Sequence, residues 1–341
     1  MKKNRLFLIA ALATATFTLL SCINDEYNPE VVRLAVNSLG SSVTTRADGA
    51  TDVTQLQNTQ FISGERIYVE TYLTGTATAH NSGVFTTTST VAALGGIELN
   101  GPATPLYYPP STNIDILAYY PSDASAAAYQ VTSSLASFTV KTDQTALPDY
   151  RISDLMYAAK ETNLDKSSRH GLTFHHALSQ VIVTIEPATS GGLTASDVNT
   201  NVTAVKINNT KTTAALSHGT AAGLKTGVIT MGALSNVADI SIKGTVANNV
   251  GIVIPQSVTG TDDGSGDPNL PLITVTYTDP TTGAHDYSYM IGSGTTVTFE
   301  AGKTYTFNLK LKLSGIELNS IEITDWQNGT GSPTNVPDIT L

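Results

Sequence analysis

The sequence predicts an all-β protein, and composition, local alternation and turn residues each point to that class. Charged residues are only 13% of the 341 residues, whereas hydrophobic residues are 40%, so strong helix formers are scarce but a core can still form. Short segments in which apolar and polar residues alternate recur along the chain, as expected for half-buried strands. Gly- and Pro-containing turns separate these segments. Many short strands at this spacing indicate β-sandwiches, and the length allows two domains.

The beginning of the chain has the pattern of an export signal. A basic start, Met1–Arg5, precedes the apolar run Leu6–Leu20, which is shorter than the roughly 20 residues of a membrane-spanning helix. The run ends in Leu19-Leu20-Ser21-Cys22, which resembles a bacterial lipobox, and Cys22 is the only cysteine. We therefore expect a signal peptide over residues 1–21 and lipidation of Cys22, with palmitate among the acyl chains. The lipid would anchor the protein without a spanning helix.

A leader is predicted to follow the lipidated cysteine, over residues 22–46. Val32, Leu34 and Val36 alternate with other residues and would lie on one face of a strand. A polar stretch then leads to Arg46 and Ala47. An arginine in an exposed Ser/Thr-rich loop is accessible to a trypsin-like protease, so Arg46 is a candidate site of proteolysis.

The remaining strands are predicted where apolar residues alternate or run continuously. In chain order these segments are residues 67–72, 114–120, 178–185, 252–254, 273–277 and 305–313. The last is the clearest, because Tyr305, Phe307, Leu309, Leu311 and Leu313 alternate with polar residues. The polar stretch at 161–170 separates two strand-rich halves, which predicts domains over residues 47–168 and 169–341.

Five segments in the same order resemble landmarks of the fimbrillin-like proteins of the Bacteroidetes. They are residues 61–67 (FISGERI), 115–121 (DILAYYP), 153–158 (SDLMYA), 172–181 (LTFHHALSQV) and 299–309 (FEAGKTYTFNL) with 321–326 (IEITDW). In addition, Asp25-Glu26 resembles the acidic signals that direct lipoproteins of this phylum to the cell surface. The combination, behind a lipobox, identifies the chain as similar to a pilus subunit precursor.

The resemblance implies two tandem β-sandwich domains of the transthyretin-like, Greek-key type and a structural, adhesive role in a surface pilus, or fimbrium. It further implies a lipoprotein of the cell outer membrane that is cleaved after Arg46 and polymerises by strand exchange. The expected partners are other pilin subunits and, before cleavage, the outer membrane. Host or bacterial surface glycans or proteins are further partner classes, and the shaft, tip or anchor position in the pilus stays open.

Strand exchange has a physical basis in this sequence. Loss of the leader strand would leave unpaired backbone groups and an apolar slot, which is a template for another strand. The resemblance implies that the donor lies in the C-terminal segment, over residues 316–341. Val336, Ile339 and Leu341 in the tail after Trp326 are candidate plugs, although their spacing departs from strict alternation. The segment Ile316–Ile323 is the alternative donor.

Catalytic and metal-binding patterns are weak. His175 and His176 are adjacent and would point to opposite faces of a strand, so they cannot chelate one metal. The acidic loop at 262–267 departs from a calcium-loop spacing, and Tyr107-Tyr108-Pro109-Pro110 is more typical of a strand end than of a sugar platform. We expect no catalytic site, no metal and no cofactor, and the net charge of −10 argues against nucleic-acid binding.

Two other functions fit the same features. A permanently lipid-anchored surface protein that binds glycans would keep its N-terminus, and so would the anchor subunit of a pilus. The Arg46 site favours a cleaved subunit over both.

Overall fold

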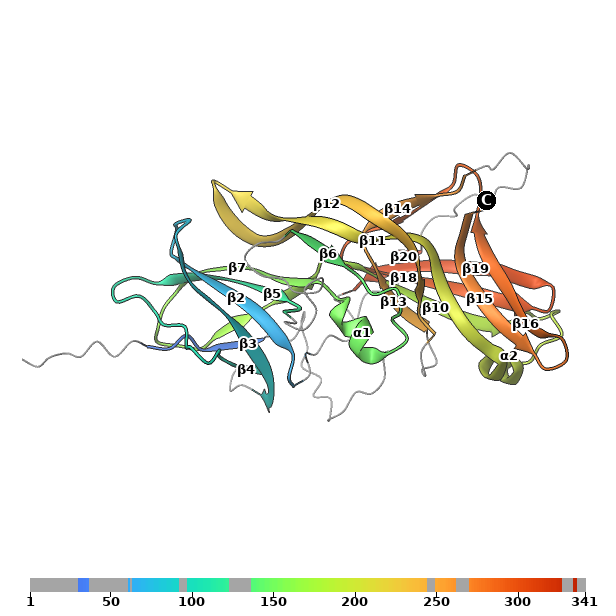
Figure 1. The fold of residues 1–341 in the computed structure, drawn as a ribbon, viewed down its shortest axis with the longest axis horizontal. Coiled ribbons are helices and arrows are strands. Elements are labelled where there is room, and N and C mark those ends of the chain that lie inside the picture. Colours follow the sequence, from blue (N-terminus) through green and yellow to red (C-terminus); the bar gives the residue numbers. More distant parts are fainter. Residues whose placement is uncertain are drawn as a thin grey trace, which may run out of the picture.

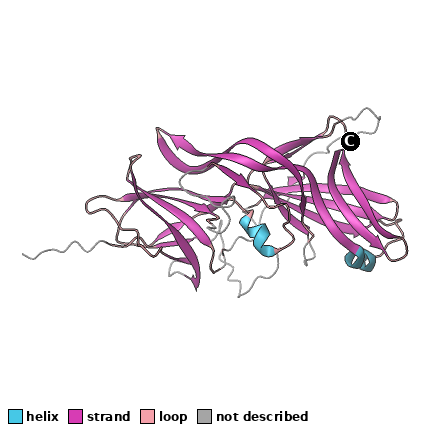
Figure 2. Ribbon diagram, in the orientation of Figure 1, coloured by secondary structure: helices cyan, strands magenta, loops and turns pink. Residues whose placement is uncertain are grey.

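The computed structural model describes residues 30–36, 61, 63–91, 97–122, 136–243, 249–261, 270–326 and 334–335. Within these ranges the chain is built from strands, apart from the short helices α1 (Leu147–Ile152) and α2 (Ala195–Asn201) (Figure 2). This confirms the predicted all-β class. Neither helix in the described ranges is long and apolar enough to cross a membrane.

The N-terminal half forms one eight-stranded sheet in the order β8-β1-β4-β3-β2-β5-β7-β9. Its strands are β1 (Leu34–Val36), β2 (Arg66–Leu73), β3 (Ala79–Val91), β4 (Ile97–Asn100), β5 (Ile114–Tyr120), β7 (Met156–Leu164), β8 (His170–Leu172) and β9 (Phe174–His176). The first and last strands in this order, β8 and β9, are separated only by Thr173. The two margins of the sheet therefore meet, and the sheet rolls around its own core.

Apolar side chains fill the inside of this rolled sheet. The fully buried ones include Ile67, Phe85, Ile116 and Phe174. Every residue of β5 is buried, because its other face, with Leu117 and Tyr119, belongs to the core shared with the C-terminal half. The sequence predicted one buried face for such strands, whereas here both faces are covered.

The C-terminal half is a sandwich of two main sheets. One has the order β13-β10-β18-β19-β20, with strands β13 (Asn249–Val253), β10 (Ser179–Pro187), β18 (Lys303–Lys312), β19 (Gly315–Asp325) and β20 (Thr334–Asn335). The other has the order β12-β11-β15-β16, with strands β12 (Leu224–Ser241), β11 (Val202–Ala221), β15 (Leu270–Asp279) and β16 (Gly283–Ile291). Strand β6 (Ser137–Thr139) also pairs with β11, and β14 (Gln256–Thr259) pairs with β17 (Thr296–Phe299). Their inward side chains form one continuous core.

The clearest predicted strand lies where expected but ends earlier. Tyr305, Phe307, Leu309 and Leu311 are buried along β18, as their alternation predicts. Leu313 follows the end of β18 and is 49% exposed. The turn to β19 begins there, so Leu313 does not reach the core.

The two halves do not divide at the predicted boundary, which lies after residue 168. Strands β8 and β9 pair with β1 and β7 of the N-terminal sheet, so this sheet extends to His176. The polar stretch at 161–170 therefore comprises the end of β7, the turn that follows and the first residue of β8, all within the first half. In addition, Phe138 and Tyr150, which precede the predicted boundary, are buried in the C-terminal core.

The segment from β6 through α1 joins the N-terminal half to the C-terminal sandwich. The Gln144 side chain, which is 1% exposed, takes the place of a neighbouring strand beside β13. Its Nε2 donates to the Ile252 carbonyl over 2.9 Å, and its Oε1 accepts from the Ile252 N–H over 2.7 Å. One side chain therefore satisfies both backbone groups of Ile252.

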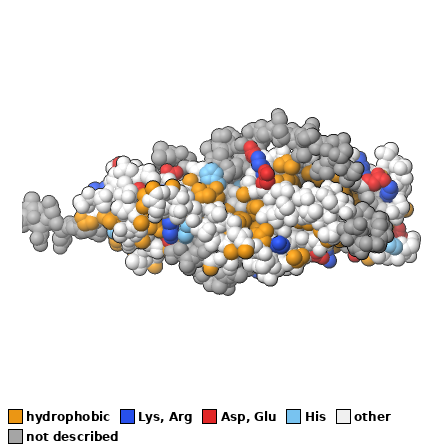
Figure 3. Space-filling view, turned by 90° about the horizontal axis from the view of Figure 1, so that it is seen from above, with side chains coloured by type: hydrophobic (Ala, Val, Ile, Leu, Met, Phe, Trp, Pro, Cys, Tyr) orange, Lys and Arg blue, Asp and Glu red, His pale blue; other side chains and the backbone are white. Residues whose placement is uncertain are grey.

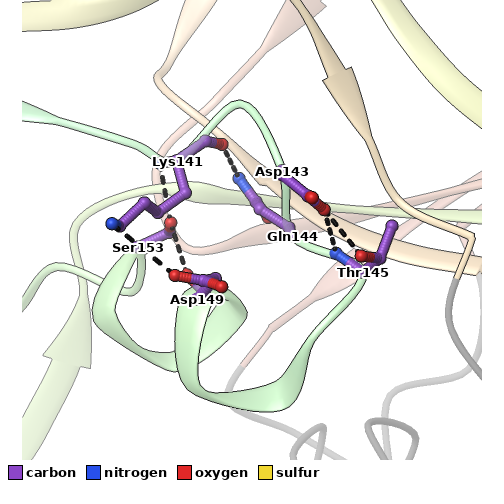
Figure 4. A network of polar contacts seen from close by, with 6 residues as sticks. All are labelled: Lys141, Asp143, Gln144, Thr145, Asp149 and Ser153. Atoms are coloured by element: carbon purple, nitrogen blue, oxygen red, sulfur yellow. Dashed lines mark hydrogen bonds and ion pairs between the residues drawn. The ribbon is translucent and has the colours of Figure 1, made fainter.

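Local polar contacts hold this segment in shape (Figure 4). Gln144 Nε2 also donates to the Lys141 carbonyl, and the Lys141 N–H donates to Ser153 Oγ. Ser153 Oγ in turn donates to the Asp149 carbonyl of α1. Asp143 Oδ1 accepts from the Thr145 N–H, which closes the turn after Gln144. The turn and the helix therefore position Gln144 opposite β13.

A second connection runs in the opposite direction. The long hairpin β11–β12 extends from the sandwich over the N-terminal sheet (Figure 1). Near its tip, Lys225 Nζ lies 3.1 Å from Oε2 of the buried Glu70, and His218 Nδ1 lies 2.8 Å from the Tyr119 hydroxyl. Burial lowers the pKa of Lys225, but hydrogen bonds to Tyr72 and Glu70 outweigh it and raise the pKa above its usual value.

Glycine is required where the hairpin crosses β7. Gly227 has a φ of +81°, and a Cβ there would lie 2.6 Å from the Ala158 carbonyl oxygen. The hairpin backbone therefore packs directly on the backbone of β7. On the face seen in Figure 3, Lys, Arg, Asp and Glu side chains are scattered in small groups among apolar and uncharged ones.

Replacement of Gln144 by alanine should weaken the joint between the halves. Gln144→Ala leaves the buried N–H and carbonyl of Ile252 without this partner, at about 1–3 kcal/mol per group. We expect the free energy of unfolding, measured by urea titration, to fall by about 2–4 kcal/mol. Thr145→Ala removes an exposed turn contact from the same loop and should change it by less than about 0.5 kcal/mol. Equal effects of the two substitutions would show that the amide pairing is unimportant.

Candidate functional site at the leader strand

The predicted leader strand lies inside the N-terminal sheet rather than at its edge. β1 pairs antiparallel with β4, where Leu34 faces Leu99, and parallel with β8, where Leu34 faces His170. Because β8 leads directly into β9 at the opposite margin, β1 is the strand that closes the rolled sheet.

Burial of β1 is nearly complete. Val32, Leu34 and Val36 are 3%, 1% and 2% exposed and belong to the core of the roll. Ala35 is 4% exposed, so the strand is covered on its other face as well. The alternation in the sequence predicted burial of Val32, Leu34 and Val36, but not of Ala35. A small residue at position 35 was the one signal that both faces are tightly packed.

A loop next to β1 extends its binding surface. The Val32 N–H donates to the Leu106 carbonyl over 2.8 Å, and the Tyr108 N–H donates to the Glu30 carbonyl over 2.9 Å. The Arg33 carbonyl accepts from the His170 N–H over 3.1 Å. Residues 30–36 are thus held by backbone hydrogen bonds along both sides.

The same contacts give a role to the tyrosines at 107 and 108. Tyr108 is 3% exposed and lies in the core of the roll, so it offers no open platform for a sugar. Burial raises the pKa of Tyr108 to about 12, and the negative charges of Asp165 and Glu30 act in the same direction. Tyr107 forms a backbone bridge with Val31.

Loss of β1 would expose two strand edges at once. The inner edges of β4 and β8 would lose their partner, and the apolar surface under Leu34 and Val36 would open. Unpaired N–H and carbonyl groups beside apolar pockets bind an extended segment by β-augmentation. This is the chemistry that the site supports.

The two histidines are separated as predicted. His176 is 5% exposed, with Nδ1 2.8 Å from Asp154 Oδ1 and its ring stacked on Trp326 at 3.8 Å between ring centroids. His175 is half-buried beside Tyr157. In the part of the chain that the structure describes, no group of three His, Cys, Asp or Glu residues could hold a metal ion.

The C-terminal donor candidates differ in their placement. The segment Ile316–Ile323 is part of β19, which pairs with β18 from Gly315 to Asp325. As an integral strand of the sandwich, it could act as a donor only if this sheet were broken. Trp326 directly follows β19, donates its backbone N–H to the Gly302 carbonyl and is buried. The tail that remains as a candidate therefore begins after Trp326.

Several predicted site residues fall outside the described residues. These are Cys22, Arg46, Ala47, Val336, Ile339 and Leu341, together with the whole acidic loop at 262–267.

Comparison with known proteins supports the family that the sequence motifs indicate. The family model described as fimbrillin-like matches residues 45–326. A putative cell adhesion protein from Bacteroides uniformis is 22% identical with a TM-score of 0.59, covering 87% of this chain and 99% of its own. One from Bacteroides ovatus is 16% identical with a TM-score of 0.53, covering 88% and 98%. No curated protein matches the sequence. These two structures share the fold, and the family match extends over most of the sequence: the chain belongs to the fimbrillin-like family.

Proposed function

We propose that this protein is a structural subunit of a surface pilus that assembles by exchange of its leader strand. The precursor is exported as a lipoprotein through Cys22 and held at the outer membrane. A trypsin-like protease cuts after Arg46, and a C-terminal segment of another subunit then takes the place of β1. The partners are other pilin subunits, and the location is the cell surface.

The observation that carries this proposal is the position of β1. A short strand near the start of the chain lies between two others, is buried on both faces and closes the sheet. A strand that serves only as an export tether would not need this position. A replaceable strand does, because its departure creates a site that only another strand can fill.

The energy of such a joint is adequate for a durable polymer. Complete burial of Val32, Leu34 and Val36 contributes about 1.5–3 kcal/mol each, or about 5–9 kcal/mol before the cost of ordering the strand. Backbone hydrogen bonds to β4 and β8 fix the direction and the register of the strand that occupies this place. A donor with comparable side chains would regain the same contacts.

The connection between the two halves supports a role in which the subunit transmits mechanical tension. β6 and Gln144 reach from the first half into the sandwich, and the β11–β12 hairpin reaches back over the first half. Tension applied at the leader slot and at the C-terminal end would therefore pass through paired strands rather than through a flexible linker.

Cleavage after Arg46 is testable by substitution. With a trypsin-like protease, the purified precursor should yield a chain that begins at Ala47 by N-terminal sequencing and then forms oligomers on native gels. Arg46→Ala should abolish both results. Arg33→Ala is the matched control and should behave like the unaltered chain, since the Arg33 carbonyl is paired with β8 and its peptide bond is protected. Oligomers formed by the Arg46→Ala chain would contradict the proposal.

The strength with which the leader strand β1 is bound should determine the rate of assembly. Leu34→Ala removes a fully buried side chain from β1 and should cost the precursor about 2–5 kcal/mol. After cleavage the weakened leader should leave faster, and oligomers should appear sooner in a time course followed by light scattering. Arg33→Ala, which changes an exposed neighbour in the sequence, should leave this rate unchanged. If both variants assembled at the same rate, release of β1 would not be part of assembly.

A further inference from the structure

An ion pair crosses the outer face of the leader strand. Arg169, directly before β8, and Glu98 in β4 form this pair through Nη2 and Oε1. β4 and β8 are separated by β1 in the strand order. Neighbouring strands are about 4.8 Å apart, so the two side chains together span about 10 Å across β1. We call this ion pair the strap.

The register places the strap on the side of Ala35 rather than on the core side. Glu98 is the direct partner of Ala35 in the antiparallel pair of β1 and β4, and directly opposed residues share one face of a sheet. In the parallel pair of β1 and β8, the register continued by one residue places Arg169 beside Arg33. Arg33 and Ala35 alternate with the core-facing Leu34 and therefore lie on the opposite face.

There is little room between the strap and β1. Ala35 is 4% exposed, although its side chain lies on the face turned away from the core. Its partner on β8 is Gly171, which has no side chain. The side chains of Arg169 and Glu98 are only 32% and 29% exposed. A methyl group fits under this cover, whereas a long or branched side chain at position 35 would have to displace the ion pair.

The strap discriminates between strands more than it strengthens their binding. Solvent screens the attraction between Arg169 and Glu98, because both side chains are partly exposed. A strand that fits therefore gains little from the ion pair. A strand with a bulky residue next to it both overfills the space and separates the two charges. Such a penalty on the wrong occupant is a source of specificity.

We propose that the strap selects which strand can occupy the place of β1. The partner that it admits is an extended segment with a small residue, such as alanine, glycine or serine, between the two apolar side chains that replace Leu34 and Val36. A segment with a large side chain at this position is rejected, even when its core-facing residues match. This inference rests on the proposed replacement of β1 and specifies the chemistry of the donor.

Hydrogen exchange of the β1 amides in the uncleaved precursor tests the strap. Ala35→Leu should speed their hydrogen exchange by about tenfold or more, because leucine does not fit under the ion pair. In the Arg169→Ala background, the same substitution should speed it by less than about threefold. Arg33→Leu introduces the same side chain at an exposed position of the same face, so its effect should stay below about threefold in both backgrounds.

Two results of this comparison would overturn the proposal. One is an equal effect of Ala35→Leu in the two backgrounds, since the strap would then not limit the space. The other is an effect of Arg33→Leu as large as that of Ala35→Leu. Circular dichroism checks that each variant folds. If Ala35→Leu does not fold, Ala35→Val takes its place and is judged by the same two results.

Competition by added peptides tests the selection of the partner. One peptide has the sequence of residues 30–36 and the other carries Ala35→Leu, and both carry Arg33→Gln so that the protease does not cut them. Each is added to the precursor during cleavage by a trypsin-like protease, and oligomers are followed by light scattering. The Ala35→Leu peptide should require a concentration at least about tenfold higher for the same delay. With the Arg169→Ala subunit, the two peptides should differ by less than about threefold.

The outcomes separate selection by the strap from strand exchange itself. Equal inhibition of the unaltered subunit by the two peptides would contradict the selection, while exchange would stand. If neither peptide delayed the oligomers, the place of β1 would not be open to an added strand, and the proposed function would fail together with the selection. Hydrogen exchange of the uncleaved precursor would then still decide whether the strap limits the space beside Ala35.

Discussion

Closure of the eight-stranded sheet by β1 is the constraint on which the N-terminal half depends. β8 and β9 lie at opposite ends of the strand order yet are consecutive in the chain, so the sheet must curl until its margins meet. β1 fills the place between β8 and β4 and satisfies the backbone groups of both. Without it, two strand edges and the core beneath Leu34 would face water, which is unfavourable for both polar and apolar groups.

The short length of β1 suits it to replacement. Three paired residues provide few ladder hydrogen bonds, so burial of Val32, Leu34 and Val36 supplies most of the binding energy. β19 is different, because it pairs with β18 over its whole length and cannot leave without opening the sandwich. The described part of the fold thus contains a short strand with few ladder hydrogen bonds, β1, and a long strand that is fully paired with its neighbour, β19. This difference is compatible with the strand exchange that we propose.

The two halves are connected by reciprocal contacts rather than by a linker. Gln144 completes the pairing of Ile252 in the sandwich, and Lys225 at the hairpin tip reaches the buried Glu70 of the rolled sheet. The Gln144 contact satisfies two buried backbone groups, and Lys225 adds an opposite charge to a buried carboxylate that also accepts hydrogen bonds from Tyr68 and Tyr72. Separation of the halves would therefore expose several buried groups together, which favours a rigid two-part subunit.

Local patterns in the sequence determined where strands occur and which class of protein this is. Alternation along 305–311, the apolar face of 32–36 and the opposite orientations of His175 and His176 all depend on the backbone geometry of single strands. The ordered motifs likewise identified the family. The partners of each strand were decided only by the tertiary structure, since pairing joins residues far apart in the chain. The burial of Ala35, the pairing of Gln144 with Ile252 and the inclusion of β8 and β9 in the first sheet all depend on such distant contacts.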